Sequence, residues 1–529
     1  MADNAERRNA VKNTSIFSVL TMLSRLLGLA RDMLKAYAFG TGIASVAFDI
    51  AFRLPNMLRN LVAEGALSQS FIPVYEKYRN KDAADGRKAI AAVLGFFLLI
   101  MGVISILVIF ALPHVIPALI GDLQQSNETT RLTINLSQIL FPYILFMSLA
   151  SIYMAAQYSH GIFWSASLGP ALLNLIILLG FGVYFFVIHV YFHSIPEKDI
   201  YAFAIVTLLA GFAQLVFQRH ISRKNKISAG ISFQFRHPVI RDLFLMMLPG
   251  VFSAAVQEIG QLIDIYLATR IESQLPGSVS ALTYSHRLIQ LPIGVFGVAV
   301  ATASLPQLSR LFVEEKFTEY KSALLVSVRL NLYLLIPPIL GLMLFSENIV
   351  SLLFERGEFN ANSTVITAKA LTFYAPGILA YALQKLFLSA MYARRKSGLP
   401  AVITVIVLIL NVIISILLIP YLMHAGLALG SALAAYIGVL IYVVIMGKKK
   451  LLPGTKETFA GLPALLFVQL LTAGSLLLVK SLPISSGLQL GTAIFLAGVV
   501  YIGFSKLLHI PEFTTFVEIF QKLLARVRR

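Results

Sequence analysis

The 529-residue chain contains no cysteine, and only 13% of its residues are charged. The absence of cysteine excludes disulfides, thiolate catalysis and Cys-ligated metal sites. Soluble domains carry about a quarter charged residues, so the low charge content argues against a soluble protein. The sequence also contains no GxxxxGK[ST] motif for nucleotide phosphates and no HExxH zinc motif. No polar loop is longer than residues 218–242, so we do not expect an enzyme.

Hydrophobic residues make up 58% of the chain and gather in long runs. Runs of about 20 apolar residues suffice to cross roughly 30 Å of hydrocarbon as an α-helix, and they are too long for barrel strands. We predict an all-α polytopic membrane protein with 14 transmembrane helices. The predicted spans are 15–39, 44–74, 89–113, 132–156, 163–188, 200–217, 243–269, 280–308, 322–344, 364–391, 400–419, 427–446, 459–479 and 487–505. Residues 1–14 are polar and precede no small-residue cleavage site, so we expect no cleavable signal peptide.

Lysine and arginine fall mostly on one side of these spans. The side that holds the N-terminus collects 29 of the 43 basic residues in its loops and tails, and the opposite side collects 5. Basic residues stay on the cytoplasmic side because they resist translocation. We therefore predict that both termini are cytoplasmic. The basic loops are 75–88, 218–242, 309–321, 392–399 and 447–458.

Short strings recur along the chain at an offset of about 233 residues. SQSFIPVYEKY at 68–78 is similar to ATASLPQLSRL at 301–311, and IYMAAQYS at 152–159 is similar to LFLSAMYA at 386–393. Transporters are often built from such repeats, with the substrate site between them. We predict two six-helix lobes and an appendage of two helices with a cytoplasmic tail. Their bounds are 1–226, 227–450 and 451–529.

Nine basic residues fall within the predicted spans, where hydrocarbon is expected. They are Arg25, Arg31, Lys35, Arg53, Arg59, Arg287, Arg329, Lys369 and Lys385. Lys35, Arg329 and Lys369 lie near span ends, where long side chains can reach the interface. The deeper arginines need another explanation, because an arginine at the bilayer centre costs at least about 2.5–3.5 kcal/mol. Such residues must pair with acids or line a hydrated cavity.

Acids within the spans are fewer than the bases. They are Asp32, Asp49, Glu64, Glu258 and Asp264. Asp49 and Arg53 are four residues apart, a spacing that allows an ion pair along one helix. The first two spans nevertheless hold five cations and three acids, which leaves a surplus of positive charge. Guanidinium is planar, permanently charged and bidentate, so the surplus predicts a bound phosphate or pyrophosphate.

Four stretches of the sequence resemble the MurJ (MviN) family, which comprises bacterial lipid II flippases of the MOP superfamily. They are SRLLGLARD at 24–32, FRLPNMLRNLVAEGALSQSFIPVY at 52–75, YSHRLIQLPIGVFGVAVATASLPQLS at 284–309 and LFERGEF at 353–359. The resemblance runs through essentially the whole chain. It implies two six-helix lobes around a central cavity, with the last two helices forming a groove for a polyprenyl tail.

The resemblance also implies the residues that bind the substrate. By matching position these are Ser24, Arg25, Arg31, Asp32, Arg53, Asn56, Arg59, Glu64, Ser280, Arg287 and Gln290. Two positions depart from the family pattern. Val46 stands where members often carry an acid, and Gln290 stands where some carry glutamate. This chain therefore carries no acid at either position.

Some family members bind sodium in the second lobe, so the resemblance implies Na⁺ or membrane-potential coupling and no other cofactor. The candidate sodium ligands are Asp264, Asn411, Ser415 and Ser431, with Ser415 replacing a family carboxylate. The implied partners are lipid II (undecaprenyl-pyrophosphate disaccharide-pentapeptide), membrane lipids and cell-wall synthesis machinery, but not nucleic acid. We expect a monomer in the bacterial cytoplasmic membrane.

Three other functions compete with lipid II transport. An exporter of another polyprenyl-pyrophosphate saccharide, such as O-antigen, would share the cationic cavity but usually lacks the last two helices. A multidrug exporter of the same fold favours cationic drugs, which a cationic lumen disfavours. A scaffold without transport would leave the buried arginines unexplained.

Overall fold

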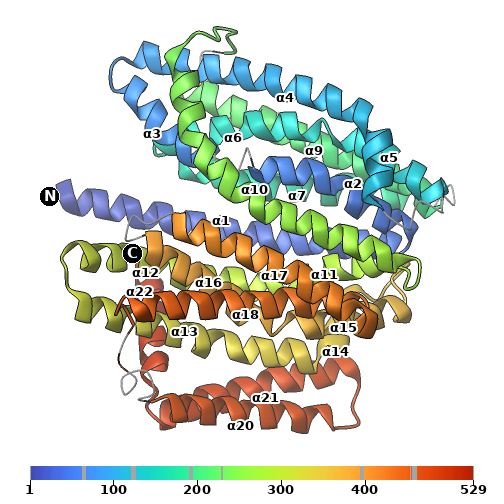
Figure 1. The fold of residues 1–529 in the computed structure, drawn as a ribbon, viewed down its shortest axis with the longest axis vertical. Coiled ribbons are helices and arrows are strands. Elements are labelled where there is room, and N and C mark those ends of the chain that lie inside the picture. Colours follow the sequence, from blue (N-terminus) through green and yellow to red (C-terminus); the bar gives the residue numbers. More distant parts are fainter. Residues whose placement is uncertain are drawn as a thin grey trace. The chain divides into compact units, whose positions relative to one another are not determined.

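The computed structural model describes residues 2–61, 67–120, 127–189, 195–227, 230–392, 398–452, 454 and 461–527 (Figure 1). Within these ranges the regular structure is helical, and no strand occurs. The chain divides into two compact units. The first comprises residues 1–280 and 356–360, and the second comprises 281–355 and 361–529. The predicted division at residues 226 and 450 follows the sequence repeat, and it stays a prediction.

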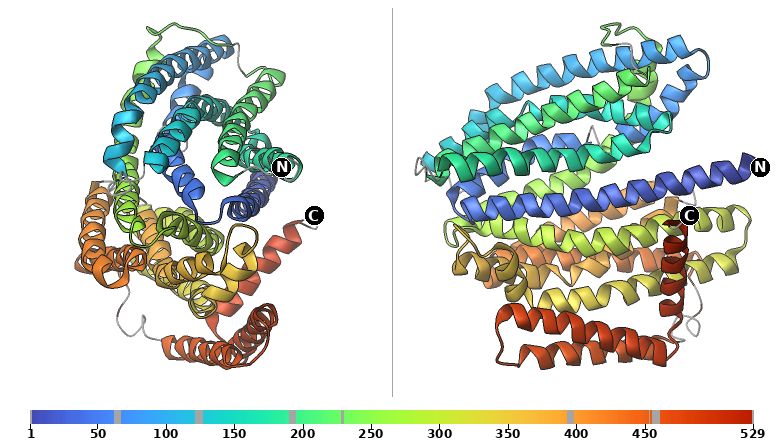
Figure 2. Two further views of the ribbon diagram at one scale, coloured as in Figure 1. Left: turned by 90° about the vertical axis from the view of Figure 1, so that its right-hand side faces the viewer. Right: turned by 180° about the vertical axis from the view of Figure 1, so that it is seen from behind.

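The first unit is a bundle of long helices that run alongside one another (Figure 2). Its helices are α1 (Ala2–Phe39), α2 (Ile43–Arg59), α3 (Leu67–Arg79), α4 (Ala83–Leu119), α5 (Asn127–Leu140), α6 (Tyr143–Ser159), α7 (Phe163–Tyr184), the π-helix η3 (Phe185–His189), α9 (Pro196–Lys224) and α10 (Pro238–Glu272). Local signals set several of these ends. The Asp82 carboxylate accepts from the Ala84 amide at 3.1 Å before α4. Prolines open α9 and α10, where a missing N–H leaves no hydrogen bond unmade.

The second unit begins within α11 (Ser278–Pro292) and ends with the C-terminal helices. The others are η4 (Ile293–Gly297), α12 (Val298–Val313), α13 (Phe317–Leu344), α14 (Ser346–Phe354), α15 (Ala361–Tyr374), α16 (Gly377–Tyr392), α17 (Gly398–Leu422), α18 (His424–Lys448), α20 (Leu462–Lys480), α21 (Ser486–Leu507) and α22 (Pro511–Val527). The helices α20 and α21 form a hairpin, and α22 crosses their direction (Figures 1 and 2).

Among the residues that the structure describes, ten helical stretches are long and apolar enough to cross a membrane. They are Ala83–Leu119, Glu128–Ser159, Phe163–Val187, Pro196–Lys224, Ser278–Val313, Phe317–Leu344, Gly398–Leu422, His424–Lys448, Leu462–Lys480 and Ser486–Leu507. The pair α15 and α16, bent by 43°, makes an eleventh if it is one span. The polytopic all-α prediction is confirmed, and the total of 14 stays a prediction. The predicted spans 15–39, 44–74 and 243–269 carry most of the charges within predicted spans, and they fall outside this set.

The helix ends repeat along the chain much as the sequence strings do. The break between α5 and α6 falls at Phe141-Pro142, and the break between α15 and α16 falls at Ala375-Pro376, 234 residues later. The helices α4 and α13 likewise begin 234 residues apart, at Ala83 and Phe317. This regular spacing supports the predicted duplication.

Apolar side chains from several helices form the core of each unit. In the first unit, Phe48, Phe181 and Phe203 pack edge to face and hold α2 against α7 and α9. Ring pairs of this kind add about 0.5–1.5 kcal/mol beyond area burial. This packing fixes the position of α2, which carries the charged residues Asp49 and Arg53.

Candidate substrate-binding site

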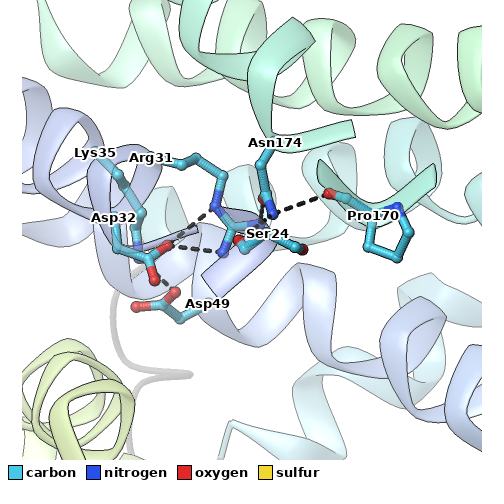
Figure 3. A network of polar contacts seen from close by, with 7 residues as sticks. All are labelled: Ser24, Arg31, Asp32, Lys35, Asp49, Pro170 and Asn174. Carbon is cyan, nitrogen blue, oxygen red and sulfur yellow. Dashed lines mark hydrogen bonds and ion pairs between the residues drawn. The ribbon is translucent and has the colours of Figure 1, made fainter. Parts of the chain in front are cut away.

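The guanidinium of Arg31 is held by one acid and one amide in the first unit (Figure 3). Its Nε and Nη2 donate to Oδ1 of Asp32 at 3.0 and 2.7 Å. Its Nη1 donates to Oδ1 of Asn174 on α7 at 3.1 Å. The Arg31 side chain retains 23% of its area exposed, so an anionic ligand can still reach it.

The amide of Asn174 can take only one orientation. Its Nδ2 donates to the carbonyl of Ser24 on α1 at 3.2 Å and to the carbonyl of Pro170 on α7 at 3.1 Å (Figure 3). The opposite rotamer would turn the two donors toward the Arg31 guanidinium, which also only donates. The acceptor oxygen must therefore face Arg31. Asn174 ties α1 to α7 and fixes the direction of the arginine.

Lys35 lies one turn further along α1 and serves a different purpose. Its ammonium forms an ion pair with the Asp49 carboxylate of α2. The other oxygen of Asp49 accepts from the hydroxyl of Ser280 at 2.8 Å, so Ser280 can only accept from the Ser45 hydroxyl, 3.0 Å away. Lys35 and Ser280 are buried. The prediction that Lys35 reaches the interface is therefore wrong, because its charge is satisfied inside the protein.

Arg53 contacts α10 instead of pairing along its own helix. Its Nη2 lies 3.5 Å from Oε2 of Glu258 and donates to Oε1 of Gln261. The other Glu258 oxygen accepts from Nδ2 of Asn60 at 3.0 Å. The suggested Asp49–Arg53 pair does not form, because Lys35 and Ser280 already engage Asp49. Glu258 is buried, so a desolvated ion pair between Arg53 and Glu258 joins α2 to α10.

The remaining residues of the first unit fall into three groups. Arg59 donates to the Tyr143 hydroxyl at 3.4 Å and to Asn60 Oδ1 at 3.2 Å. Arg25 and Asn56 are half-buried on α1 and α2. Glu64 lies outside the residues that the structure describes.

In the second unit, α11 carries Arg287 and Gln290 one turn apart. Arg287 is half-buried, and Gln290 is exposed. Both lie upstream of Pro292 and the π-helix η4, where the regular hydrogen-bond ladder of the span changes. Irregular backbone at membrane depth is tolerated beside protein or water, so this segment suits a substrate path.

Three of the four candidate sodium ligands come together in the second unit. The hydroxyls of Ser415 and Ser431 donate to Oδ1 of Asn411 at 3.3 and 3.1 Å. Asp264 belongs to the first unit. The three neutral oxygen groups are hard ligands of the type that suits Na⁺, but they bring no charge of their own. Binding of Na⁺ by this group stays a prediction.

Together these contacts sort the basic groups by what they can do. Lys35 and Arg53 are engaged by buried acids and stabilise helix contacts. Arg31 is oriented by Asp32 and Asn174 but remains partly exposed, which suits bidentate binding of a phosphate. Anion binding by these residues stays a prediction at this point.

A family model described as lipid II flippase MurJ matches residues 35–497. The chain belongs to the MurJ family. A probable lipid II flippase MurJ of Buchnera aphidicola subsp. Schizaphis graminum is 31% identical over 430 residues, which cover 81% of this chain and 82% of the relative. The resemblance seen in the motifs is thereby confirmed.

Solved structures agree with this membership. A structure titled lipid II flippase MurJ, inward closed conformation, has a TM-score of 0.77 and 26% identity, and it covers 93% of this chain and 98% of that one. An inward-facing multidrug MATE transporter of the MOP superfamily has a TM-score of 0.66 at 15% identity, over 82% of this chain and 98% of that one. The second match shows a shared fold alone. As a MurJ family member with many apolar helices, the protein is integral to the inner membrane.

Sequence reasoning missed Asn174 and Gln261. A lone asparagine within the apolar run ALLNLIILL was the available signal, because polar residues inside spans are costly and usually functional. Gln261 follows Glu258 by three residues on α10, so the same helix face supplies both groups to Arg53.

Proposed function

We propose that this MurJ family member flips lipid II from the cytoplasmic to the outer leaflet and acts as a transporter, not an enzyme. The observation that carries the proposal is the oriented, partly exposed Arg31 within a transmembrane chain of this family. Lipid II carries a pyrophosphate between its polyprenyl tail and its disaccharide. The guanidinium groups of Arg25, Arg31, Arg59 and Arg287 would bind that pyrophosphate in a central cationic cavity.

Neutralising the pyrophosphate lowers the barrier to crossing. An unpaired ion in hydrocarbon costs tens of kcal/mol by Born solvation, and a cavity lined by arginines replaces most of the lost hydration. The tail meanwhile stays in lipid along α20 and α21, whose outward apolar side chains such as Leu470 and Phe495 are exposed. The head group would thus cross through the polar cavity while the tail stays in the lipid.

Fourteen spans in two six-helix lobes and an appendage would support alternating access. The lobes, residues 1–226 and 227–450, would rock about the midplane and open the cavity to each side in turn. Both termini would face the cytoplasm, as the distribution of basic loops predicts. Ser24, Asp32, Arg53, Asn56, Glu64, Ser280 and Gln290 would complete the polar lining.

Resetting the cycle needs a source of free energy. Moving one charge through the membrane potential yields about 2.3 kcal/mol per 100 mV. A sodium ion on Asp264, Asn411, Ser415 and Ser431 is the second source. Transport that survives sodium removal but stops when ionophores collapse the potential assigns the role to voltage, and the opposite pattern assigns it to Na⁺.

Complementation tests the proposed function. A bacterium depleted of its lipid II flippase would express this chain as wild type, Arg31→Ala, Arg287→Ala or the control Arg310→Ala. Arg310 is basic but 69% of its side chain is exposed. We expect rescue by wild type and Arg310→Ala, and no rescue by the other two at equal membrane levels. Rescue by all variants would remove the cavity arginines from the mechanism.

The same experiment separates the competing functions. If wild type fails to rescue at normal membrane levels, an exporter of another polyprenyl-pyrophosphate saccharide becomes the better assignment. A multidrug exporter would instead confer resistance to cationic drugs, which we do not expect.

A further inference from the structure

The C-terminal helix α22 differs from the helices before it in both pattern and direction. It begins at Pro511, beyond residues 35–497 that the family model matches. Its apolar residues fall on one arc at 100° per residue and its polar residues on the other. The apolar arc holds Phe513, Phe516, Val517, Ile519, Phe520, Leu523, Leu524 and Val527, and the polar arc holds Thr514, Thr515, Glu518, Gln521, Lys522 and Arg526.

Exposure follows the two arcs at the described side chains except Thr515, which lies on the polar arc but is partly buried. Thr514, Glu518 and Gln521 are exposed, whereas Phe513 and Phe516 are partly buried. Within the second unit, α22 runs across the direction of α13, α20 and α21, as two views agree (Figures 1 and 2). Because α20 and α21 are apolar enough to span the membrane, a helix that crosses them at their ends lies along the membrane surface.

Buried contacts fix the start of α22 at the ends of the spanning helices. Arg329 of α13 and Glu512 form an ion pair at 2.8 Å, with only 13% and 5% of their side chains exposed. Ile510 is buried in a cluster with Tyr333 and Leu465. Gly461 precedes α20 with φ of +74°, and a Cβ there would approach Arg329 closely. The junction joins α13, the start of α20 and the start of α22.

The charge of the end of the chain points to the ligand. Residues 521–529, QKLLARVRR, contain four cations and no acid. Lys522 and Arg526 are four residues apart, so both lie on the polar arc beside the apolar one. Anionic lipid headgroups attract such residues, and the apolar arc can enter the boundary beneath them. We infer that α22 is an interfacial membrane helix that binds anionic phospholipids and anchors the α20–α21 hairpin at the basic face of the bilayer.

The absence of cysteine makes the test direct. Single variants Phe520→Cys and Glu518→Cys place a polarity-sensitive fluorophore on opposite arcs of α22 in the full chain. Each labelled protein is reconstituted in zwitterionic vesicles with or without anionic phospholipid. Quenching is measured with a nitroxide lipid and with aqueous acrylamide, which is neutral. We expect the 520 label to be quenched by the lipid and shielded from acrylamide, and the 518 label to show the reverse.

Charge variants separate lipid binding from simple burial. Anionic lipid should increase quenching of the 520 label by the nitroxide lipid, and salt should reduce the increase. The double variant Lys522→Gln/Arg526→Gln should lose this increase. Each charge removed should lower the ratio of membrane-bound to unbound α22 by about fivefold. Lys448→Gln/Lys450→Gln, basic positions at the end of α18, should retain it.

Three results would overturn the inference. Equal access of acrylamide to both labels in every vesicle would show that α22 leaves the membrane. A 520 label shielded from both quenchers would mean that protein covers the apolar arc. Lipid quenching that ignores anionic lipid and both charge variants would remove anionic phospholipid as the ligand.

Discussion

The Lys35 ammonium and the Asp49 carboxylate form an ion pair between α1 and α2 in which 5% and 9% of the two side chains are exposed. Ser280 donates to the second Asp49 oxygen, so the acid is satisfied on both sides. Neither charge could persist alone at this depth, because an isolated buried ion costs several kcal/mol. The pair therefore holds α1 and α2 in register beside the Arg31 cluster.

Breaking this pair from one side should destabilise the protein strongly. Lys35→Met or Asp49→Asn alone should each lower the free energy of unfolding by about 3–5 kcal/mol, because each disrupts the buried charge pair. The double variant should cost less than the sum of the two. Thermal unfolding in detergent, run as a double-mutant cycle, measures the difference. Additive losses would show that the two charges do not interact.

Asn174 should affect transport through Arg31. Asn174→Ala removes the oxygen that orients the guanidinium and should reduce transport about 5- to 150-fold, because a lost hydrogen bond to a charge is worth about 1–3 kcal/mol. Complementation at reduced expression, with membrane levels measured alongside, would detect the loss. Asn135→Ala is the control, since Asn135 bonds Tyr201 away from Arg31. Equal rescue by both variants would contradict a positioning role.

Much of the fold could be predicted because apolar runs and proline breaks are local signals. Eleven of the fourteen predicted spans coincide with observed apolar helices or the bent pair, and the break at Pro376 follows its counterpart at Pro142. The spans at 15–39, 44–74 and 243–269 were harder to assign, since their apolar character is diluted by charge. In these helices the polar residues pair across helices.

The site was predictable in residue type but not in pairing. Spacing along one helix suggested Asp49 with Arg53, yet each meets a residue from another helix, Lys35 and Glu258 respectively. Sequence distance carries no information about such contacts. Asn174, 143 residues from Arg31, shows the same limit. A lone polar residue in an apolar span could have been noticed, but its partner could not.

Two glycines hold the loop 356–360 against the end of α1. Gly40 and Gly357 adopt positive φ of +54° and +62°, and a Cβ on either would lie closer than 3.0 Å to facing backbone. The Glu358 amide donates to the Tyr37 carbonyl at 2.9 Å. Gly40→Ala and Gly357→Ala should each cost at least about 1–2 kcal/mol from the strained backbone, with steric overlap added.

Gly42 provides the matched control for these substitutions. Its φ is −71°, and a Cβ on Gly42 would lie 3.5 Å from the nearest atom, the Phe39 carbonyl oxygen. Gly42→Ala should therefore be tolerated. Unfolding temperature and membrane level measure all three variants. A Gly42→Ala loss as large as the others would mean that α1–α2 flexibility, not the docked loop, is the cause.

Glu272 should make stability depend on pH. It lies at the end of α10, beyond the predicted span 243–269, and its carboxylate accepts from the Val279 amide at 3.0 Å and from the Gly277 amide before α11. Burial raises the pKa of the Glu272 carboxyl from its ordinary 4.5 to about 7, and the backbone donors offset only part of this shift. The folded state therefore favours the protonated acid.

The sign of the effect follows from this raised pKa. Stability from Glu272 is fully present below about pH 4.5 and is lost as pH rises to about 7, by on the order of 3 kcal/mol. Unfolding temperature in detergent should fall across this window. Glu272→Gln should flatten that slope, although it loses part of the cap, and Glu314→Gln at the exposed end of α12 should keep it. A Glu272→Gln variant with the wild-type slope would show that another group titrates there.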